Sequence, residues 1–294
     1  MYKSLVVSIN VCCASLLWSQ SPAASSPQLS VHWEELTAAD FKAGIAKAQG
    51  TCLLPFGILE KHGPHLPLGN DLLNVRYVSL NAAQQEYAIV FPEYYFGQIF
   101  EAKHQPGTIA YSRRLELELL QETTDEMARN GCKKIIIVNG HGGNNSLLPF
   151  FAQSQLESPH DYVVYVQGIA RTAPGGPKPT TDPATDMHAG ERESSVSLIA
   201  RPDLVHLDRA PQESGADMGR LSALPEGLYT GIWWYAKFPN HYQGNSAGAT
   251  AARGQAATDA SAAQIANAFR AIKRDETALR LQKEFFERAA KPKI

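Results

Sequence analysis

The chain has 294 residues, of which 44% are hydrophobic and 19% charged, the composition of an ordinary globular protein that can bury a full core. Its formal net charge is only −2 at pH 7, so it offers no broad electrostatic attraction to nucleic acid or to an anionic membrane surface. These values favour one large domain that acts on a small molecule or a peptide, without a nucleic-acid partner.

The first 25 residues have the pattern of a secretory signal peptide. Lys3 supplies a short basic start, residues 5–18 are largely apolar, and small residues follow at 21–25. The apolar run contains polar residues and is shorter than the ~20 residues of a membrane span. We therefore expect a signal peptide over 1–25, a mature domain over 31–294, no membrane attachment after cleavage, and a periplasmic or secreted location. An uncleaved anchor and lipoprotein processing at Cys12 are the alternatives.

Short apolar runs alternate with longer amphipathic ones in the mature chain, which is the pattern of an α/β fold with a mostly parallel sheet. The predicted strands, rich in Val, Ile, Leu or Tyr, cover 51–59, 88–92, 134–139 and 162–166. The predicted helices between them cover 70–86, 112–130 and 144–156. Later elements are a Pro/Gly-rich loop over 170–186, a helical stretch that ends at 199, and one or two helices from about residue 255.

The first candidate site follows the strand that begins at residue 51. Glu60 and His62 leave this strand two residues apart, so on an extended chain their side chains point to the same side. Asp71 begins the next helix after a Gly/Pro-rich turn that can fold it back beside them. Two carboxylates with an imidazole are a ligand set of Zn, Mn or Fe hydrolase sites. The simpler alternative is a solvated pair at a strand end and a helix cap.

The second candidate site is the glycine-rich turn after the strand 134–139. Ligands bind at the carboxyl ends of strands in open parallel sheets, and His141 stands there between glycines. A glycine-rich loop before a helix also suits a phosphate group, but no Gly-Lys-Ser/Thr follows. A purely structural histidine is the other alternative.

The third candidate site opens the helical stretch that ends at residue 199. His188 and Glu193 lie across its start, where both side chains can point into one cavity. The acidic residues Glu191 and Glu193 also suit a solvated first helical turn, because the helix dipole favours negative charge there.

These three segments resemble the signatures of the creatininase (creatinine amidohydrolase) family, in the family's order. The resemblance rests on residues 54–71, on Asn139 to Asn144 and on His188 to Ser194, and it extends from about Trp33 to Arg253. It implies an α/β/α sandwich with three layers, two divalent metal ions, and hydrolysis of a non-peptide or cyclic amide. It also implies a homo-oligomer, as large as a hexamer.

The resemblance also assigns roles to residues. Glu60 and His141 would bind one metal, His62 the other, and Asp71 both. His188 would transfer a proton beside the substrate, and Glu193 would complete the second metal or its surroundings. The implied mechanism uses a water held between the metals, which ionises near pH 7 and attacks the amide carbonyl.

One departure from the family pattern concerns the second metal. Creatininase has a tyrosine and then a metal-binding glutamate after the loop histidine, where this chain has Gly142 and Gly143. The missing carboxylate must come from elsewhere, most simply from Glu193, with Glu191 in reserve. The missing tyrosine makes creatinine itself a doubtful substrate.

Two rival functions remain open. A two-metal phosphoesterase can use the same ligands, and Lys61 and Lys103 are the nearby basic residues in the sequence. A secreted metal- or ligand-binding protein without turnover is the rival outside enzymes. The aromatic segment of Trp233, Trp234 and Tyr235 either lines a pocket or belongs to the core or a subunit interface.

The spacing of two cysteines gives a further expectation. Cys52 precedes Glu60 by eight residues and Cys132 precedes His141 by nine. If Glu60 and His141 share a metal at the carboxyl ends of neighbouring strands, the cysteines lie at a similar depth near the opposite ends, within disulfide range. An oxidising compartment would allow the bond, and two buried free thiols are the alternative.

Overall fold

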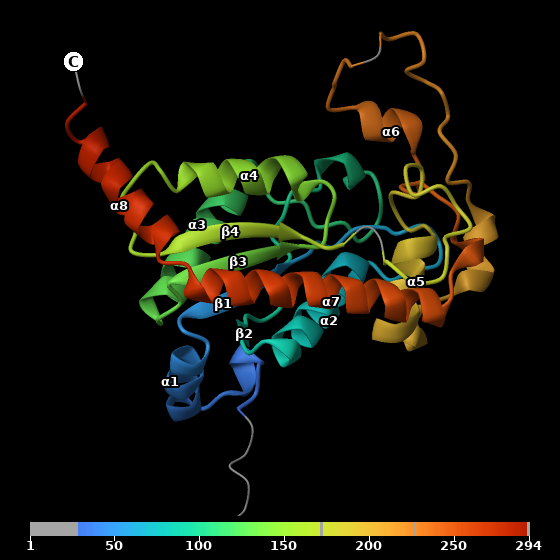
Figure 1. Cartoon of the computed structure of the whole chain (residues 1–294). Coiled ribbons are helices and arrows are strands. Elements are labelled where there is room, and N and C mark those ends of the chain that lie inside the picture. The colour runs from blue at the N-terminus through green and yellow to red at the C-terminus, as the bar shows by residue number, and fades with distance from the viewer. Residues whose placement is uncertain (1–28, 171–172, 226, 293–294) are drawn as a thin grey trace, which may run out of the picture.

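The computed structural model of the chain describes residues 29–170, 173–225 and 227–292 (Figure 1). Its centre is a parallel sheet of four strands in the order β2-β1-β3-β4. The strands are β1 (Thr51–Phe56), β2 (Ile89–Val90), β3 (Lys134–Asn139) and β4 (Val163–Gly168). The expected signal peptide over 1–25 lies outside the described residues.

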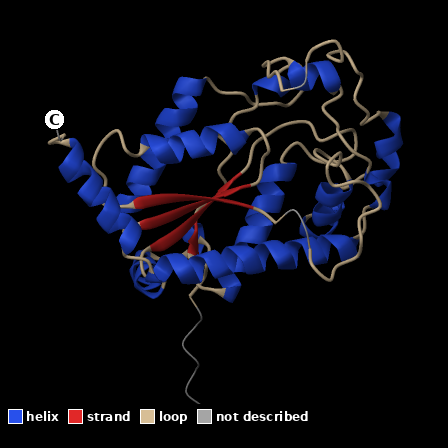
Figure 2. Ribbon diagram, turned by 45° about the horizontal axis from the view of Figure 1, so that its top comes forward, coloured by secondary structure: helices blue, strands red, loops and turns tan. Residues whose placement is uncertain are grey.

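Helices cover both faces of this sheet (Figures 1 and 2). On one face lie α3 (Arg113–Arg129) and α4 (Asn144–Ser154), and α1 (Ala38–Lys47) packs against the same core. On the other face lie α2 (Asn70–Gln85) and α7 (Ala251–Arg274), with α5 (Glu191–Ala200) against both of them. The remaining α-helices are α6 (Trp233–Lys237) and α8 (Thr277–Ala289). Short 3₁₀ helices cover Trp33–Glu35, Phe100–Ala102, Pro202–Leu204, Leu207–Gln212 and Ser246–Gly248.

The core has two halves because neighbouring strand residues point to opposite faces. In β3, Ile135 and Ile137 face the α3 and α4 layer, and Ile136 and Val138 face the α2 and α7 layer. All four side chains are fully buried, which is typical of a parallel sheet covered on both sides. The predicted fold class, a three-layer α/β/α sandwich, is confirmed. None of the helices within the described residues is long and apolar enough to cross a membrane.

Several predicted boundaries were wrong by a few residues. The strand predicted over 51–59 ends at Phe56, because its neighbour β3 ends at Asn139, which stands opposite Phe56 in the register. The strand predicted over 88–92 is only two residues long, and the one predicted over 162–166 runs from Val163 to Gly168. Helix α1 was not predicted at all, although Thr37 caps it by accepting a hydrogen bond from the Asp40 amide.

Cys52 and Cys132 are joined by a disulfide, with 5.6 Å between their Cα atoms. Cys52 lies in β1, opposite Ile135, and Cys132 lies two residues before β3. The bond therefore links the two central strands near their amino ends. The predicted proximity is confirmed, and of the two alternatives the structure contains the bridge.

Candidate active site

Two glycines allow the ends of the central strands to approach the start of α2 closely. A Cβ atom on Gly57, directly after β1, would lie 2.5 Å from the backbone of Leu72, which is impossible without movement. A Cβ atom on Gly140, directly after β3, would lie 2.6 Å from Cβ of Val75. The missing side chains at these two positions let α2 pack close to the strand ends. Asp71, on the first turn of α2, therefore lies beside the residues that follow both strands.

Asp71 lies between two histidines and faces each with a different oxygen. Its Oδ1 atom is 2.9 Å from Nε2 of His62, and its Oδ2 atom is 2.9 Å from Nδ1 of His141. The same nitrogen of His141 is 2.9 Å from Oε1 of Glu60. The four residues are buried. The structure therefore brings together the four residues that the sequence predicted to converge.

Among the described residues, the side-chain donors fall into overlapping groups whose atoms lie within 4.8 Å of one another. One group is Glu60, Asp71 and His141, another is His62, His188 and Glu193, and a third, Glu60, His188 and His241, shares a residue with each of them. In the second group, Oε2 of Glu193 lies 3.8 Å from Nε2 of His62 and accepts a hydrogen bond from the Ala189 amide at 2.7 Å. Asp71 belongs to the first group, where its Oδ2 atom faces His141, and its Oδ1 atom faces His62 of the second group.

His188 is held in one orientation by the backbone. Its Nε2 atom lies 2.9 Å from the carbonyl oxygen of Lys61, to which it can only donate. The other nitrogen, Nδ1, then carries no proton in the neutral ring and lies 3.9 Å from Oε1 of Glu60. His188 therefore presents an unprotonated nitrogen to the cluster.

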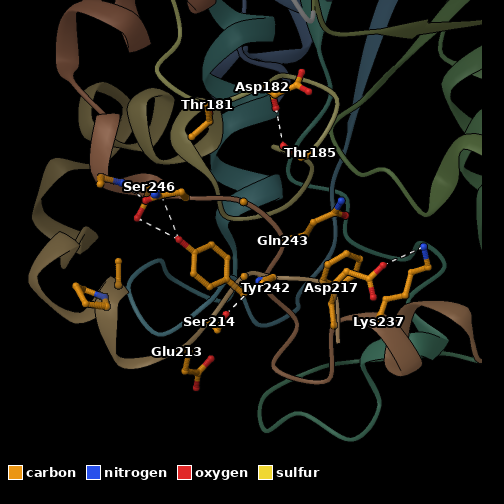
Figure 3. Close-up of a pocket in the computed structure, with 18 of the residues that line it drawn as sticks. Thr181, Asp182, Thr185, Glu213, Ser214, Asp217, Lys237, Tyr242, Gln243 and Ser246 are labelled. Atoms are coloured by element: carbon orange, nitrogen blue, oxygen red, sulfur yellow. Dashed lines mark hydrogen bonds and ion pairs between the residues drawn. The ribbon is translucent and has the colours of Figure 1, made fainter. Parts of the chain in front are cut away.

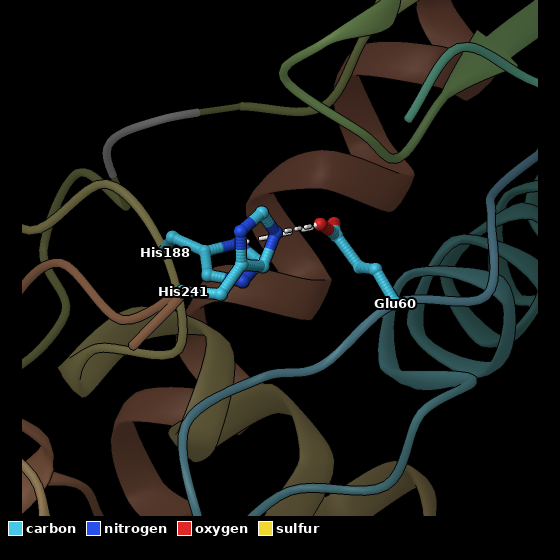
Figure 4. Close-up of side chains that lie close together, drawn as sticks. All are labelled: Glu60, His188 and His241. Atoms are coloured by element: carbon cyan, nitrogen blue, oxygen red, sulfur yellow. Dashed lines mark hydrogen bonds and ion pairs between the residues drawn. The ribbon is translucent and has the colours of Figure 1, made fainter. Parts of the chain in front are cut away.

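His241 also belongs to the site, although the sequence interpretation placed it only beside the aromatic segment and named it neither as a ligand nor as a catalytic residue. Its Nε2 atom contacts Oε2 of Glu60, and its Nδ1 atom accepts a hydrogen bond from the indole nitrogen of Trp234 at 2.8 Å. Figure 4 shows His188 and His241 side by side, both directed at Glu60. The aromatic residues before His241 were the only sign of it in the sequence, and they do not distinguish a site from a core.

A short antiparallel β-bridge between the segments that carry His188 and His241 fixes the positions of these two histidines. His188 and Gln243 exchange backbone hydrogen bonds of 2.9 and 3.0 Å. Each of the two bridged segments contains a non-glycine residue in the left-handed region, Ala189 with φ 56° and His241 with φ 54°. Such conformations are unfavourable and persist where the surrounding structure enforces them, often at functional sites.

The histidines of the cluster differ in protonation state because their electrostatic surroundings differ. Burial alone would lower the pKa of His62, but Asp71, Glu60 and Glu193 outweigh it and raise that pKa to about 9. Burial would also lower the pKa of His141, which Glu60 and Asp71 instead hold well above its ordinary value. Burial lowers the pKa of His188 to about 3. In this arrangement, protons on His62 and His141 balance the buried carboxylates.

Glu60 and Asp71 are correspondingly ionised. Burial would raise the pKa of Glu60, but His141 and His188 hold it well below its ordinary value. The pKa of Asp71 is also lowered, because His62 and His141 outweigh its burial. By contrast, burial raises the pKa of Glu193 to about 7.

Glu191, which the sequence left in reserve as a ligand, points away from the cluster. Its carboxylate accepts hydrogen bonds from the backbone and hydroxyl groups of Thr180 and Thr181. It also forms an ion pair of 2.9 Å with Arg253. Glu191 therefore fastens the loop before α5 to α7, and Glu193 is the glutamate of this segment that lies beside His62.

A pocket of about 530 Å³ opens onto the cluster. Trp233 and Trp234 of the aromatic segment line it together with Tyr229, whereas Tyr235 is not among the lining residues. Of the basic residues considered for a phosphoesterase, Lys61 instead pairs with Glu213 at 2.7 Å, and neither Lys61 nor Lys103 lines the pocket. Arg113 does line it.

A second, larger hollow of about 1150 Å³ is lined in part by residues 242–247 (Figure 3). Tyr242 lines it and is hydrogen-bonded to the Ser246 amide at 3.1 Å. Asp217 and Lys237, which also line it, are paired at 3.2 Å. None of the clustered donors around Asp71 lines this hollow.

Buried histidines and carboxylates at the strand ends of an α/β/α sandwich are an arrangement suited to metal-assisted hydrolysis. A model of the creatininase family, described as creatinine amidohydrolase, matches residues 34–269. The chain therefore belongs to the creatininase family, and with it to the amidohydrolases.

Individual relatives agree with this placement. Over 219 residues the chain is 28% identical to the creatinine amidohydrolase of Pseudomonas putida, which covers 67% of this chain and 82% of that protein. Over 175 residues it is 32% identical to the mycofactocin precursor peptide peptidase of Mycolicibacterium smegmatis, covering 58% of this chain and 65% of that relative. A solved structure titled "Creatininase Mn" shares the fold, with a TM-score of 0.69 and 23% identity over 84% of this chain and 100% of that one.

Proposed function

We propose that this protein is a metal-dependent amidohydrolase that binds two divalent ions, with Asp71 as the residue that they share. The observation that carries this proposal is the placement of Asp71, whose two oxygens lie 2.9 Å from His62 and from His141. The proposed ligands are Glu60, Asp71 and His141 for one ion, and His62, Asp71 and Glu193 for the other.

The donor set fits such ions. Oε1 of Glu60 is buried and lies 2.9 Å from Nδ1 of His141 without a well-directed hydrogen bond among the described residues, so a cation that contacts both atoms would satisfy them. Nitrogen and oxygen donors together suit zinc or manganese, and also iron. Divalent ions in such a site polarise the carbonyl of the substrate and lower the pKa of a bound water.

The side chains around this cluster have distinct tasks in the proposed reaction. His188 is the proposed proton carrier, because its hydrogen bond to the Lys61 carbonyl leaves Nδ1 free to take a proton and return it to the leaving nitrogen. Without a metal, burial raises the pKa of Glu193 to about 7, so this carboxyl group can hold a proton near neutral pH and must release it to act as a ligand. His241 holds the carboxylate of Glu60 in place.

The substrate is proposed to be a small amide, either a cyclic or other non-peptide amide or the end of a peptide. A pocket of about 530 Å³ is of the size that holds small molecules. Relatives of this chain include both a creatinine amidohydrolase and a peptide peptidase, so both kinds of amide are included.

A panel of cyclic ureides, formamides and short peptides, incubated with the purified protein, tests this function. We expect release of an amine or a carboxylate from at least one member, loss of the reaction with a chelator, and recovery when zinc or manganese is added. Turnover that survives exhaustive chelation would contradict the proposal.

We also propose that the protein is exported and forms a homo-oligomer. The disulfide between Cys52 and Cys132 supports an oxidising compartment. Exposed apolar residues on and before α6, including Leu228, Tyr229 and Ile232, support an interface with a second copy. Mass spectrometry should find a mature start near Ser25, and light scattering should give a multiple of the chain mass. An intact Met1 on protein found in the cytoplasm would contradict export. An active monomer would contradict the homo-oligomer.

A further inference from the structure

Two carboxyl groups outside the proposed ligand set line the same pocket as the cluster. Glu101 lies in the short 3₁₀ helix Phe100–Ala102, and Glu116 lies on the first turn of α3. Both line the pocket of about 530 Å³, together with Glu60, Asp71 and His141. The neighbouring Ala102 is buried against Ile58 and Ile99, which fixes the position of the helix that carries Glu101.

Glu116 lacks the partner that a buried carboxyl group needs. Glu116 is only 1% exposed. Its Oε1 atom accepts no hydrogen bond from any of the described residues. Burial and then the negative charge of Glu101 raise its pKa to about 7. A buried polar group without a partner destabilises the fold, so the arrangement is complete only when a donor enters the pocket.

No basic side chain neutralises this pair within the described part of the chain. Arg113 lines the pocket one turn before Glu116. Even so, no ion pair among the described residues involves Glu101 or Glu116. The two carboxyl groups therefore form an acidic wall that a positive group from outside the chain can satisfy.

The absence of a side chain at Gly143 opens the space between this wall and the cluster. A Cβ atom there would lie 2.3 Å from Nε2 of His141 and 3.1 Å from Oε1 of Glu101. Nε2 of His141 is itself buried without a hydrogen-bond partner among the described residues. A Cβ atom on Gly142 would meet nothing within 4 Å. A substrate atom can therefore occupy the space beside His141 and reach Glu101.

We propose that Glu101 and Glu116 form a subsite for a cationic group of the substrate, a guanidinium or an ammonium, held next to Gly143 while the amide lies at the cluster. This inference rests on the proposed function and names the substrate class within it. A guanidinium suits the subsite best, because its N–H groups form a planar fork that matches a carboxylate. A neutral amide offers fewer donors and no charge to set against two carboxyl groups.

The direct test compares two ligands of similar shape that differ in charge. Methylguanidinium chloride and N-methylurea are titrated by calorimetry into the protein as purified, with its metals in place. We expect methylguanidinium to bind about tenfold more tightly or better, since hydrogen bonds between charged groups are the strong ones. Glu116→Gln and Glu101→Gln should each remove most of this preference while binding of N-methylurea stays unchanged.

Glu118→Gln is the matched control. Glu118 lies on the same helix, its side chain is 50% exposed, and its ion pair among the described residues is with Arg114. This variant should keep the full preference for methylguanidinium. If Glu116→Gln does not fold, Glu101→Gln carries the test, because Glu101 is less buried. Equal binding of the two ligands by the unaltered protein, or the same loss in the control, would overturn the subsite.

The outcome is separable from that of the proposed function, because ligand binding does not require turnover. Hydrolysis of neutral and cationic amides at equal kcat/KM would refute the subsite and leave the amidohydrolase intact. Preferential binding of methylguanidinium without hydrolysis of any amide would support the subsite and refute the proposed amidohydrolase activity.

Discussion

The indole nitrogen of Trp234 donates a hydrogen bond of 2.8 Å to Nδ1 of His241. A ring that accepts at Nδ1 carries its proton on Nε2, so His241 donates to Oε2 of Glu60. Trp234 therefore fixes both the tautomer and the direction of a histidine that positions a proposed metal ligand.

Replacing His241 should weaken metal binding without unfolding the protein. Asparagine tolerates the left-handed backbone at this position but is too short to replace the imidazole. Loss of such an outer partner typically lowers metal affinity about 10- to 100-fold. Competition with a chelator should show this fall for His241→Asn and a smaller one for Trp234→Phe. Trp233→Phe changes a ring that packs against Trp234 and Tyr229. This variant should match the unaltered protein, and an equal loss there would refute the assignment.

Metal binding should release protons and strengthen as the pH rises. The pKa of His62 is raised to about 9 and that of His141 is also raised, so both rings hold protons at pH 7 and must lose them to bind a metal. Affinity should therefore fall as the pH drops below 9. Calorimetry at pH 7 in Tris and in phosphate should give different heats, corresponding to about two protons released. Identical heats in the two buffers would contradict this account.

Much of the site could be read from the sequence because local spacing fixes it. Glu60 and His62 follow one strand, His141 follows its neighbour, and parallel strands end at one edge of a sheet. His188 and Glu193 share one short segment. That the segment with His188 and Glu193 joins the other residues follows from the resemblance to the creatininase signatures and not from spacing.

His241 and the pair Glu101 and Glu116 could not be predicted in this way. Each reaches the site from a loop or a distant helix, and their places depend on contacts such as the bridge between His188 and Gln243. A single sequence contains no signal of those contacts. The two-residue length of β2 also depends on its place at the edge of the sheet.

The disulfide should stabilise the fold without contributing to the active site. Cys52 and Cys132 enclose a separation of 80 residues, for which the chain-entropy model gives up to about 4–5 kcal/mol. Replacing both by alanine should lower the free energy of unfolding by up to that amount, measured by urea denaturation. Metal content of the folded protein should not change, because the bond lies at the opposite ends of the strands. Two titratable thiols in the exported protein would show that the bond does not form.

Gly57 should be intolerant of even one added carbon. A Cβ atom there would lie 2.5 Å from the backbone of Leu72, so Gly57→Ala must push α2 and Asp71 away from the strand ends. We expect a loss of about 1–3 kcal/mol in unfolding free energy together with weaker metal binding. Gly168→Ala is the control, since it also ends a strand and meets nothing within 4 Å. Equal behaviour of the two variants would argue against the close approach.

The metal content of three purified proteins tests the central claim most directly. Elemental analysis should find two divalent ions per chain in the unaltered protein and in His188→Ala, which keeps its ligands but should lose turnover. Asp71→Ala should lose both ions, because the two oxygens of Asp71 serve the His62 side and the His141 side alike. Two ions retained by Asp71→Ala, or none in the unaltered protein, would contradict the account.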